Sequence, residues 1–341
     1  MSETLSIRRR LKHSRRVRTS SVRVILQNLL ALCRAVATYL TTRVIFLPAA
    51  ISKQPNQTLY DDILNSNVNT LNLSSPTINE RSYVIVLVCS KPNDFEIRQT
   101  IRRTWASPIH SKAVRKKIVT VIFLIGTGHD NFIAEDEQFG DILRVDVLDS
   151  YTNIVYKLLA AYRWIELNYP GKFILKIDSD VVVILDRILN RISSGKAKTI
   201  QCYVNQSRKP MRSTASKWYI PPSIYSGHYL PNYCSGPTYL ITPATLSAIL
   251  QASHYAKVIE VEDVFFTGLL ARKANIKLQQ ERGIWHLWKP SQPCVNGLGT
   301  VISYPIHSTS AIKLQRAWHH LSNLRCRWFL ERIVFSLIFD D

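Results

Sequence analysis

Four short apolar runs, separated by polar segments, dominate the pattern of residues 81–180. Runs of this length, flanked by turn residues, predict buried strands, here over 83–88, 118–125, 142–148 and 173–177. Apolar residues recur at helical spacing from Ile154 to Ile165, and Pro170-Gly171 predicts the end of that helix. Strands that alternate with helices predict an α/β fold in which helices flank a mostly parallel central sheet.

The second half of the chain has a different pattern. It is rich in aromatic residues, prolines and loop-like stretches, which predicts a loop-rich half beside the sheet. Two further helices are expected here. One begins at Pro243 with Thr242 as its N-cap, and the other runs from about residue 310 to 324.

The N-terminal region has the composition of a membrane leader. Residues 1–23 contain eight Lys or Arg and one Glu, and residues 24–51 are largely apolar but are interrupted by Arg34 and Arg43. A basic flank before an apolar stretch predicts a cytoplasmic tail followed by a signal anchor. The alternative is a basic amphipathic leader, because each arginine near a bilayer centre costs roughly 2.5–3.5 kcal/mol.

Residues 52–80 are rich in Asn, Ser, Thr and Gln without periodicity, which predicts a stem or linker before a catalytic domain at 81–330. Glycosylation acceptors occur at Asn56, Asn72 and Asn205. Together with the leader they favour a lumenal catalytic domain in the secretory pathway.

The charge and the cysteines exclude some classes of protein. The net charge of +20 suggests a nucleic-acid binder, but much of it lies in the first 23 residues and no long basic helical stripe follows. The six cysteines show no C-x-x-C spacing, which argues against zinc ribbons and thioredoxin-like chemistry. One or two disulfides are expected among the last four cysteines.

Asp178-Ser179-Asp180 ends the apolar run at 173–177. Ligand sites in α/β proteins lie at the carboxyl ends of strands, and carboxylates bind hard divalent cations whose other positions are filled by water and phosphate oxygens. A D-x-D triplet alone is weak evidence, because a solvated turn also explains it.

Basic and polar residues elsewhere are candidates for the same site. Arg98, Arg102 and Trp105 follow i, i+4, i+7 and share a helical face that could receive a diphosphate and a base, or be a solvated face with a packed tryptophan. Asn153 follows another strand, and Lys157 on the next helix could meet a phosphate or be exposed.

Two segments of the second half are candidates for sugar contact and catalysis. Trp218-Tyr219 and the stretch at 233–236 form an aromatic loop region that either stacks on sugars or packs in the core. Glu262-Asp263 lies inside an apolar segment, where a carboxylate is costly to bury unless it has a role. A carboxylate at this place is a candidate general base. The alternative is that the two acids cap a helix.

Five motifs occur in an order that resembles the β-1,3-galactosyltransferase and β-1,3-N-acetylglucosaminyltransferase family, glycosyltransferase family 31. They are Arg98-Gln-Thr-Ile-Arg-Arg-Thr-Trp105, Asp149-Ser-Tyr-Thr-Asn153, Lys176-Ile-Asp-Ser-Asp-Val181, Tyr233-Cys-Ser-Gly236 and Glu262-Asp-Val264. The resemblance spans residues 81–326 and implies a GT-A-like fold. It also implies a UDP-galactose or UDP-N-acetylglucosamine donor, Mn²⁺, a glycan acceptor, inversion at the anomeric carbon and type II topology in the Golgi membrane.

The resemblance also implies roles for individual residues. Asp178 and Asp180 fall on the outer acids of the family's D-D-D, with Asp180 as the metal ligand and Asp178 on the donor side. Asp263 falls on the catalytic base. The spacing to Leu324-Arg325-Cys326 points to His307, rather than His286, as the histidine that binds the metal. Arg98, Arg102, Trp105, Asn153 and Lys157 are expected on the donor.

The function expected from the sequence is therefore a metal-dependent, inverting hexosyltransferase that forms a β-1,3 linkage on a protein or lipid glycan. The alternative is a catalytically inactive protein of the same fold that acts as a glycan-binding module or chaperone. Retention of Asp178, Asp180, Asp263 and His307 argues against that alternative, and no nucleic-acid partner is expected.

Overall fold

The computed structural model describes residues 55–128, 133–192, 195–285, 294–295, 298–324 and 326. They belong to a compact unit that begins at Gln54. The predicted basic tail at 1–23 and signal anchor at 24–51 lie outside the described residues. Within the part that is described, none of the helices has the length and apolar character needed to cross a membrane.

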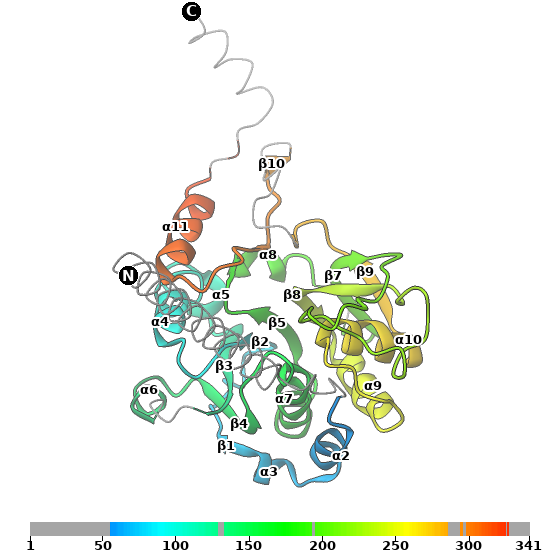
Figure 1. The fold of residues 1–341 in the computed structure, drawn as a ribbon. Coiled ribbons are helices and arrows are strands. Elements are labelled where there is room, and N and C mark those ends of the chain that lie inside the picture. The colour runs from blue at the N-terminus through cyan, green and yellow to red at the C-terminus, as the bar shows by residue number, and fades with distance from the viewer. Residues whose placement is uncertain are drawn as a thin grey trace, which may run out of the picture. The chain divides into compact units, whose positions relative to one another are not determined.

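An eight-stranded sheet forms the centre of this unit (Figure 1). Its spatial order is β1-β4-β3-β2-β5-β8-β7-β9. Four of its seven pairings are parallel, including the central block β4-β3-β2-β5. The strands are β1 (Asn72–Ser74), β2 (Val84–Cys89), β3 (Val119–Thr127), β4 (Ile142–Leu148), β5 (Phe173–Asp178), β7 (Thr199–Asn205), β8 (Tyr233–Ile241) and β9 (Lys277–Gln280).

Two short ribbons accompany the main sheet. β6 (Val181–Val183) pairs antiparallel with β12 (Ser303–Pro305), and β10 (Cys294–Val295) pairs with β11 (Leu298–Gly299). The helices are α2 (Gln57–Asn65), α3 (Val68–Leu71), α4 (Phe95–Arg103), α5 (Lys112–Arg115), α6 (Ile133–Phe139), α7 (Ile154–Asn168), α8 (Leu185–Leu189), α9 (Pro243–Ser253), the π-helix η1 (Val264–Leu270), α10 (Ala271–Lys273) and α11 (Ala311–Ser322).

The sheet separates two hydrophobic cores. Alternate residues of a strand point to opposite faces, and β2 divides accordingly: Ile85 and Leu87 pack in one core, and Val84, Val86 and Val88 in the other. The first core holds buried residues of α2, α7, α9 and η1, and the second those of α4, α8 and α11. Because both faces are covered, the central strands are mostly apolar, and Lys176 of β5 is a buried exception. The expected α/β architecture is confirmed.

The folded unit starts earlier than the predicted domain boundary at residue 81. Tyr60, Ile63 and Leu64 of α2 are buried at the spacing of one helical face, and α2 packs against α7. Further along, β1 adds an antiparallel edge strand to β4. Residues 57–74, interpreted from composition as linker, are therefore part of the folded unit, because a few apolar residues at helical spacing suffice to anchor them.

Two disulfides are present among the described residues, Cys202–Cys234 and Cys294–Cys326. They confirm the expectation that the last four cysteines pair. Cys89 at the end of β2 is a buried free thiol, and burial raises the pKa of this thiol to about 12. The thiol is therefore protonated at neutral pH.

Candidate active site

The acidic triplet lies where β5 leaves the sheet. Asp178 is the last residue of β5 and is in register with Cys89 at the end of the parallel strand β2. The backbone N–H of Ser179 donates to the carbonyl of Cys89 at 3.1 Å, which fixes the turn between the two acids. Both carboxylates are therefore held at the carboxyl edge of the parallel block, where α/β proteins bind ligands.

His307 is brought to Asp180 by strand pairing. Pro305 of β12 lies opposite Val181 of β6, and the Ile306 N–H donates to the Asp180 carbonyl at 2.8 Å. His307 itself has a φ of 50°, in the left-handed region that a non-glycine residue adopts at a cost of roughly 1 kcal/mol or more. Such strain is concentrated at functional sites, which fits the predicted role of this histidine.

The carboxyl of Asp180 has a perturbed pKa. Burial, and then the charge of Asp178, raise it to about 6, and the nearby His307 opposes the shift. Two carboxylates and an imidazole are thus close enough for their charges to interact.

Asp263 is positioned by the start of η1, and π-helices are frequent at functional sites. One of its carboxylate oxygens, Oδ1, accepts from the Val264 N–H at 2.8 Å. The backbone of Gly236 passes so close that a Cβ there would lie 3.2 Å from Oδ2, so a side chain at this position would crowd that oxygen. Burial, and then the charge of Glu262, raise the pKa of Asp263 to about 7, which suits a general base at neutral pH.

Lys176 connects the two acidic segments. Its ammonium group is buried in β5 and donates to Asp178 Oδ1 at 2.6 Å, Glu262 Oε1 at 2.7 Å and the Gly236 carbonyl at 2.7 Å. Burial alone lowers the pKa of Lys176, but the two carboxylates raise it well above its ordinary value. The lysine is therefore charged, and it links the metal-side acids to the residue next to Asp263.

A single pocket of about 720 Å³ contains all four of the predicted central residues, Asp178, Asp180, Asp263 and His307. They come from β5, the turn before β6, the start of η1 and the segment after β12, which are far apart in sequence. Aromatic side chains of Tyr151, Trp218 and Tyr233 also line this pocket. Trp218 and Tyr233 belong to the aromatic loop region of the sequence, for which sugar stacking and core packing were the alternatives, and both line the pocket.

The predicted platform of Arg98, Arg102 and Trp105 is not at this pocket. Arg98 is buried and bonds Glu135 at 2.6 Å, and Arg102 bonds Asp141 at 2.7 Å. The helix ends at Arg103, and Trp105 packs in the second core with 1% of its surface exposed. The shared face is real, but acids from later segments occupy it, so the structure gives these residues a stabilising role instead of donor binding.

Asn153 and Lys157 also make contacts within the protein. The Asn153 side chain donates to the Leu148 carbonyl at 2.8 Å. Lys157 is buried, bonds Asp149 Oδ2 at 2.5 Å and donates to the Ser90 carbonyl at 3.2 Å. Lys157 thereby joins the carboxyl ends of β2 and β4 close to the site, and neither side chain lines the pocket.

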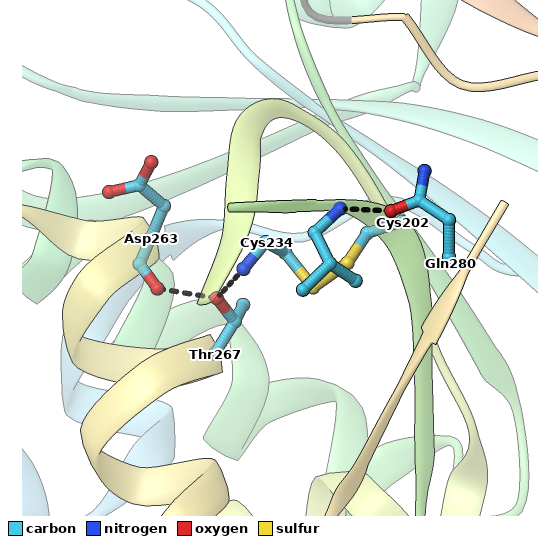
Figure 2. The surroundings of a disulfide bond; sticks show 6 residues. Cys202, Cys234, Asp263, Thr267 and Gln280 are labelled. Atoms are coloured by element: carbon cyan, nitrogen blue, oxygen red, sulfur yellow. Dashed lines mark hydrogen bonds between the residues drawn. A yellow bond between two sulfur atoms is a disulfide. The ribbon is translucent and has the colours of Figure 1, made fainter. Parts of the chain in front are cut away.

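The disulfide Cys202–Cys234 is connected to Asp263 through Thr267 (Figure 2). Figure 2 shows the Cys234 N–H bonded to Thr267 Oγ1, and the same hydroxyl bonded to the carbonyl of Asp263, at 2.8 Å and 2.5 Å. The covalent link between β7 and β8 therefore reaches the first turn of η1 through one threonine. The sequence indicated the cysteines but not this connection.

A divalent cation fits the site beside Asp180 and His307. No cluster of three His, Cys, Asp or Glu side chains that could hold a metal occurs among the described residues. Two protein ligands are enough where diphosphate oxygens and water complete the coordination shell. A cation there would also relieve the repulsion between Asp178 and Asp180.

The fold and the pocket together define an α/β protein in which two neighbouring acids at the sheet edge and a separate carboxyl, Asp263, share one pocket. The family model "Galactosyltransferase" matches residues 96–282, more than half of the chain. The protein belongs to this family, which makes it a hexosyltransferase.

Relatives include beta-1,3-galactosyltransferase 1 of Mus musculus, 28% identical over 256 residues, which cover 72% of this chain and 76% of the relative. Beta-1,3-galactosyltransferase 2 of Homo sapiens is 25% identical, with 70% of this chain and 58% of that protein covered. A solved structure, the glycosyltransferase GlyE of Streptococcus pneumoniae TIGR4, matches with a TM-score of 0.40 and 10% identity over 75% of this chain and 64% of that one.

Proposed function

We propose that this hexosyltransferase transfers galactose or N-acetylglucosamine from a UDP-sugar to a glycan acceptor, with Mn²⁺ as cofactor, and forms a β-1,3 linkage with inversion. The observation that carries the proposal is the convergence of Asp178, Asp180, His307 and Asp263 in one pocket. The relatives named beta-1,3-galactosyltransferase support the choice of sugar and linkage.

The residues divide into a donor side and an acceptor side. Asp180 and His307 would hold the cation, and Asp178, fixed by Lys176, would support the donor beside it. A bound cation neutralises charge that develops on the diphosphate leaving group. Asp263 takes the proton of the acceptor hydroxyl as the new C–O bond forms and the bond to UDP breaks. Attack from the face opposite UDP inverts the anomeric carbon, and no covalent enzyme intermediate is needed.

The direct test measures UDP release from UDP-galactose and UDP-N-acetylglucosamine, with Mn²⁺ and with a chelator. We expect Mn²⁺-dependent release with at least one donor. In Asp180→Asn the Mn²⁺ concentration for half-maximal rate should rise about 10- to 100-fold, because a ligand carboxylate is lost. The matched control is Asp146→Asn, which removes an exposed carboxyl on β4 and should leave the requirement unchanged. A rate of UDP release that is the same with and without the chelator would contradict the proposed metal dependence. The absence of UDP release with both donors would contradict the proposal and favour a glycan-binding module.

We further propose that the protein is a type II Golgi membrane protein with a lumenal catalytic unit. The basic and apolar leader at 1–51 supports this location. Two disulfides also support it, because disulfides persist in oxidising compartments.

The three predicted glycosylation acceptors differ in how exposed their side-chain amides are. Asn205 is buried with 9% exposure and lines the pocket, and both amide atoms of Asn72 are buried. Asn56 is exposed, and its Oδ1 accepts from the backbone N–H of Leu59, which leaves Nδ2 for a glycan.

Expression in a secretory host should therefore give a chain with glycan on Asn56. The mass shift on glycosidase treatment should vanish in Thr58→Ala, which removes the acceptor motif without touching the helix cap. Ser207→Ala, the matched change beside Asn205, should not alter it. An unshifted wild-type chain would count against the lumenal location.

A further inference from the structure

The loop between β7 and β8 forms one wall of the active-site pocket and carries an unusual charge. From Gln206 to Asn232 the sequence contains Arg208, Lys209, Arg212 and Lys217, and no Asp or Glu. Three of these cations, Arg208, Lys209 and Lys217, line the pocket and form its cationic wall. None of the three forms an ion pair with a carboxylate of the described part of the chain. Their charges are available to a ligand.

The loop holds these cations in a defined arrangement. The fourth cation, Arg212, donates to the carbonyls of Ile220 at 2.6 Å and Tyr225 at 2.7 Å, which fastens the loop internally. The Leu230 N–H donates to the Arg208 carbonyl at 2.8 Å, and Ile220 and Leu230 are buried beneath. The backbone that carries these three cations is therefore held in place, so little of it has to be ordered when a ligand binds.

The cations lie on the acceptor side of the pocket. Lys217 Nζ is 4.7 Å from the centre of the Tyr151 ring and 4.9 Å from that of Trp218. After burial, the charge of Asp263, followed by those of Glu262 and Asp178, raises the pKa of Tyr151. Asp263 also raises the pKa of Tyr233, and Arg208 lowers it. Through these two tyrosines, Lys217 and Arg208 lie toward Asp263 in the pocket, where the acceptor hydroxyl must be.

We propose that the acceptor is an anionic oligosaccharide whose carboxylate or sulfate is bound by Arg208, Lys209 and Lys217 while its sugar rings stack on Tyr151 and Trp218. This inference rests on the proposed function, because it assigns the substrate class of the same site. The exposed fraction is 49% for Trp218 and 42% for Tyr151, as stacking on a sugar face requires.

Matched pairs of acceptors test the proposal. The first pair is N-acetyllactosamine and its 6-O-sulfated form, and the second is a β-galactosyl disaccharide whose second sugar is glucose or glucuronic acid. For the anionic member of at least one pair we expect a kcat/KM about tenfold higher or more, through a lower KM, as one charge-assisted contact provides. The two pairs distinguish a sulfate from a carboxylate as the recognised group.

The variant that tests the wall is Arg208→Gln/Lys217→Gln, both exposed positions whose change leaves the buried loop contacts in place. In this double variant the ratio of kcat/KM between the anionic and the neutral acceptor of each pair should be close to one. The KM for the UDP-sugar should be unchanged. The control Lys313→Gln removes an exposed lysine of α11, outside the pocket, and should retain the wild-type ratio. Added salt should lower the ratio in wild type and in the control, but not in the double variant.

Calorimetric titration of the same acceptors in the presence of UDP and Mn²⁺ compares the affinities for the anionic and the neutral member of each pair without turnover. Equal affinity for both members of each pair, or a preference that survives in the double variant, overturns the proposal. A higher donor KM with unchanged acceptor preference also overturns it, because the cations would then serve the diphosphate. Mn²⁺-dependent UDP release without an anionic preference rejects this inference alone, whereas the absence of any release rejects the proposed function.

Discussion

Replacement of Asp263 by asparagine is expected to abolish sugar transfer and, at the same time, to stabilise the protein. The amide cannot take the proton of the acceptor hydroxyl, and loss of a general base costs about 10²–10⁴ in rate. The amide oxygen of the new side chain can still accept from the Val264 N–H, so the start of η1 remains capped. Initial-rate measurements with donor and acceptor in excess measure the loss.

The stabilisation follows from the pKa of this carboxyl. In the folded protein the pKa is raised from 3.8 to about 7, so folded Asp263 holds its proton over a range in which the unfolded chain has lost it. Stability contributed by that proton is therefore lost as pH rises from about 4 to about 7. Asparagine has no such loss. Above pH 7 the variant should melt several degrees higher than wild type, and near pH 4 the two melting temperatures should agree.

The pH dependence of the wild-type rate is a second consequence. Because the carboxylate is the active form, kcat/KM should rise with pH and level off above about 7. Glu260→Gln is the matched control: the same chemical change three residues earlier, at the same pocket, with an expected rate loss of less than about tenfold. An active Asp263→Asn, or a Glu260→Gln that is as inactive, would assign the base to another group.

The strands and the main helices could be predicted from sequence because each carries its own periodic signal. The run at 173–177 became β5 and the helix predicted from Ile154 ends at Asn168, directly before Tyr169 and Pro170. Residues 57–74 escaped prediction because only Tyr60, Ile63 and Leu64 mark α2 within a polar composition. Local periodicity is weak there, and packing against α7 supplies the stability.

The centre of the site was predictable for another reason. Asp178, Asp180, Asp263 and His307 belong to ordered motifs, and the structure brings them into one pocket. Arg98, Arg102 and Trp105 were misassigned because a sequence shows which residues share a helical face, but not which distant acids occupy it. Glu135 and Asp141 lie nearly 40 residues away and pair with that face.

Lys176 was overlooked, although a lysine inside the apolar run of β5 is itself a signal. A buried ammonium requires partners, and its partners are separated from it by 2 residues at Asp178 and by 86 at Glu262. The short separation is visible in the sequence. The long one depends on β5 and β8 lying side by side, which places Gly236 and the segment before η1 over the lysine.

Lys176→Met is expected to have the largest effect on stability. It leaves the carboxylates of Asp178 and Glu262 without their buried partner, and removal of one member of a buried ion pair costs about 3–5 kcal/mol. At roughly 2–4 °C per kcal/mol, the melting temperature should fall by about 10 °C. Lys172→Met is the matched control, because its ammonium donates to the carbonyls of Glu80 and Ser82, and the expected loss is about 1 kcal/mol.

Two further measurements distinguish a lost ion pair from a lost packing contact. Adding Glu262→Gln to Lys176→Met should recover part of the lost stability, because one of the two uncompensated carboxylates is removed. The folded fraction of Lys176→Met should also show an altered pH profile. The charge of Lys176 lowers the pKa of Asp263, so its removal should move the rising limb of kcat/KM to higher pH. A destabilised variant with an unchanged pH profile would mean that Lys176 supports the fold without setting the electrostatics of the base.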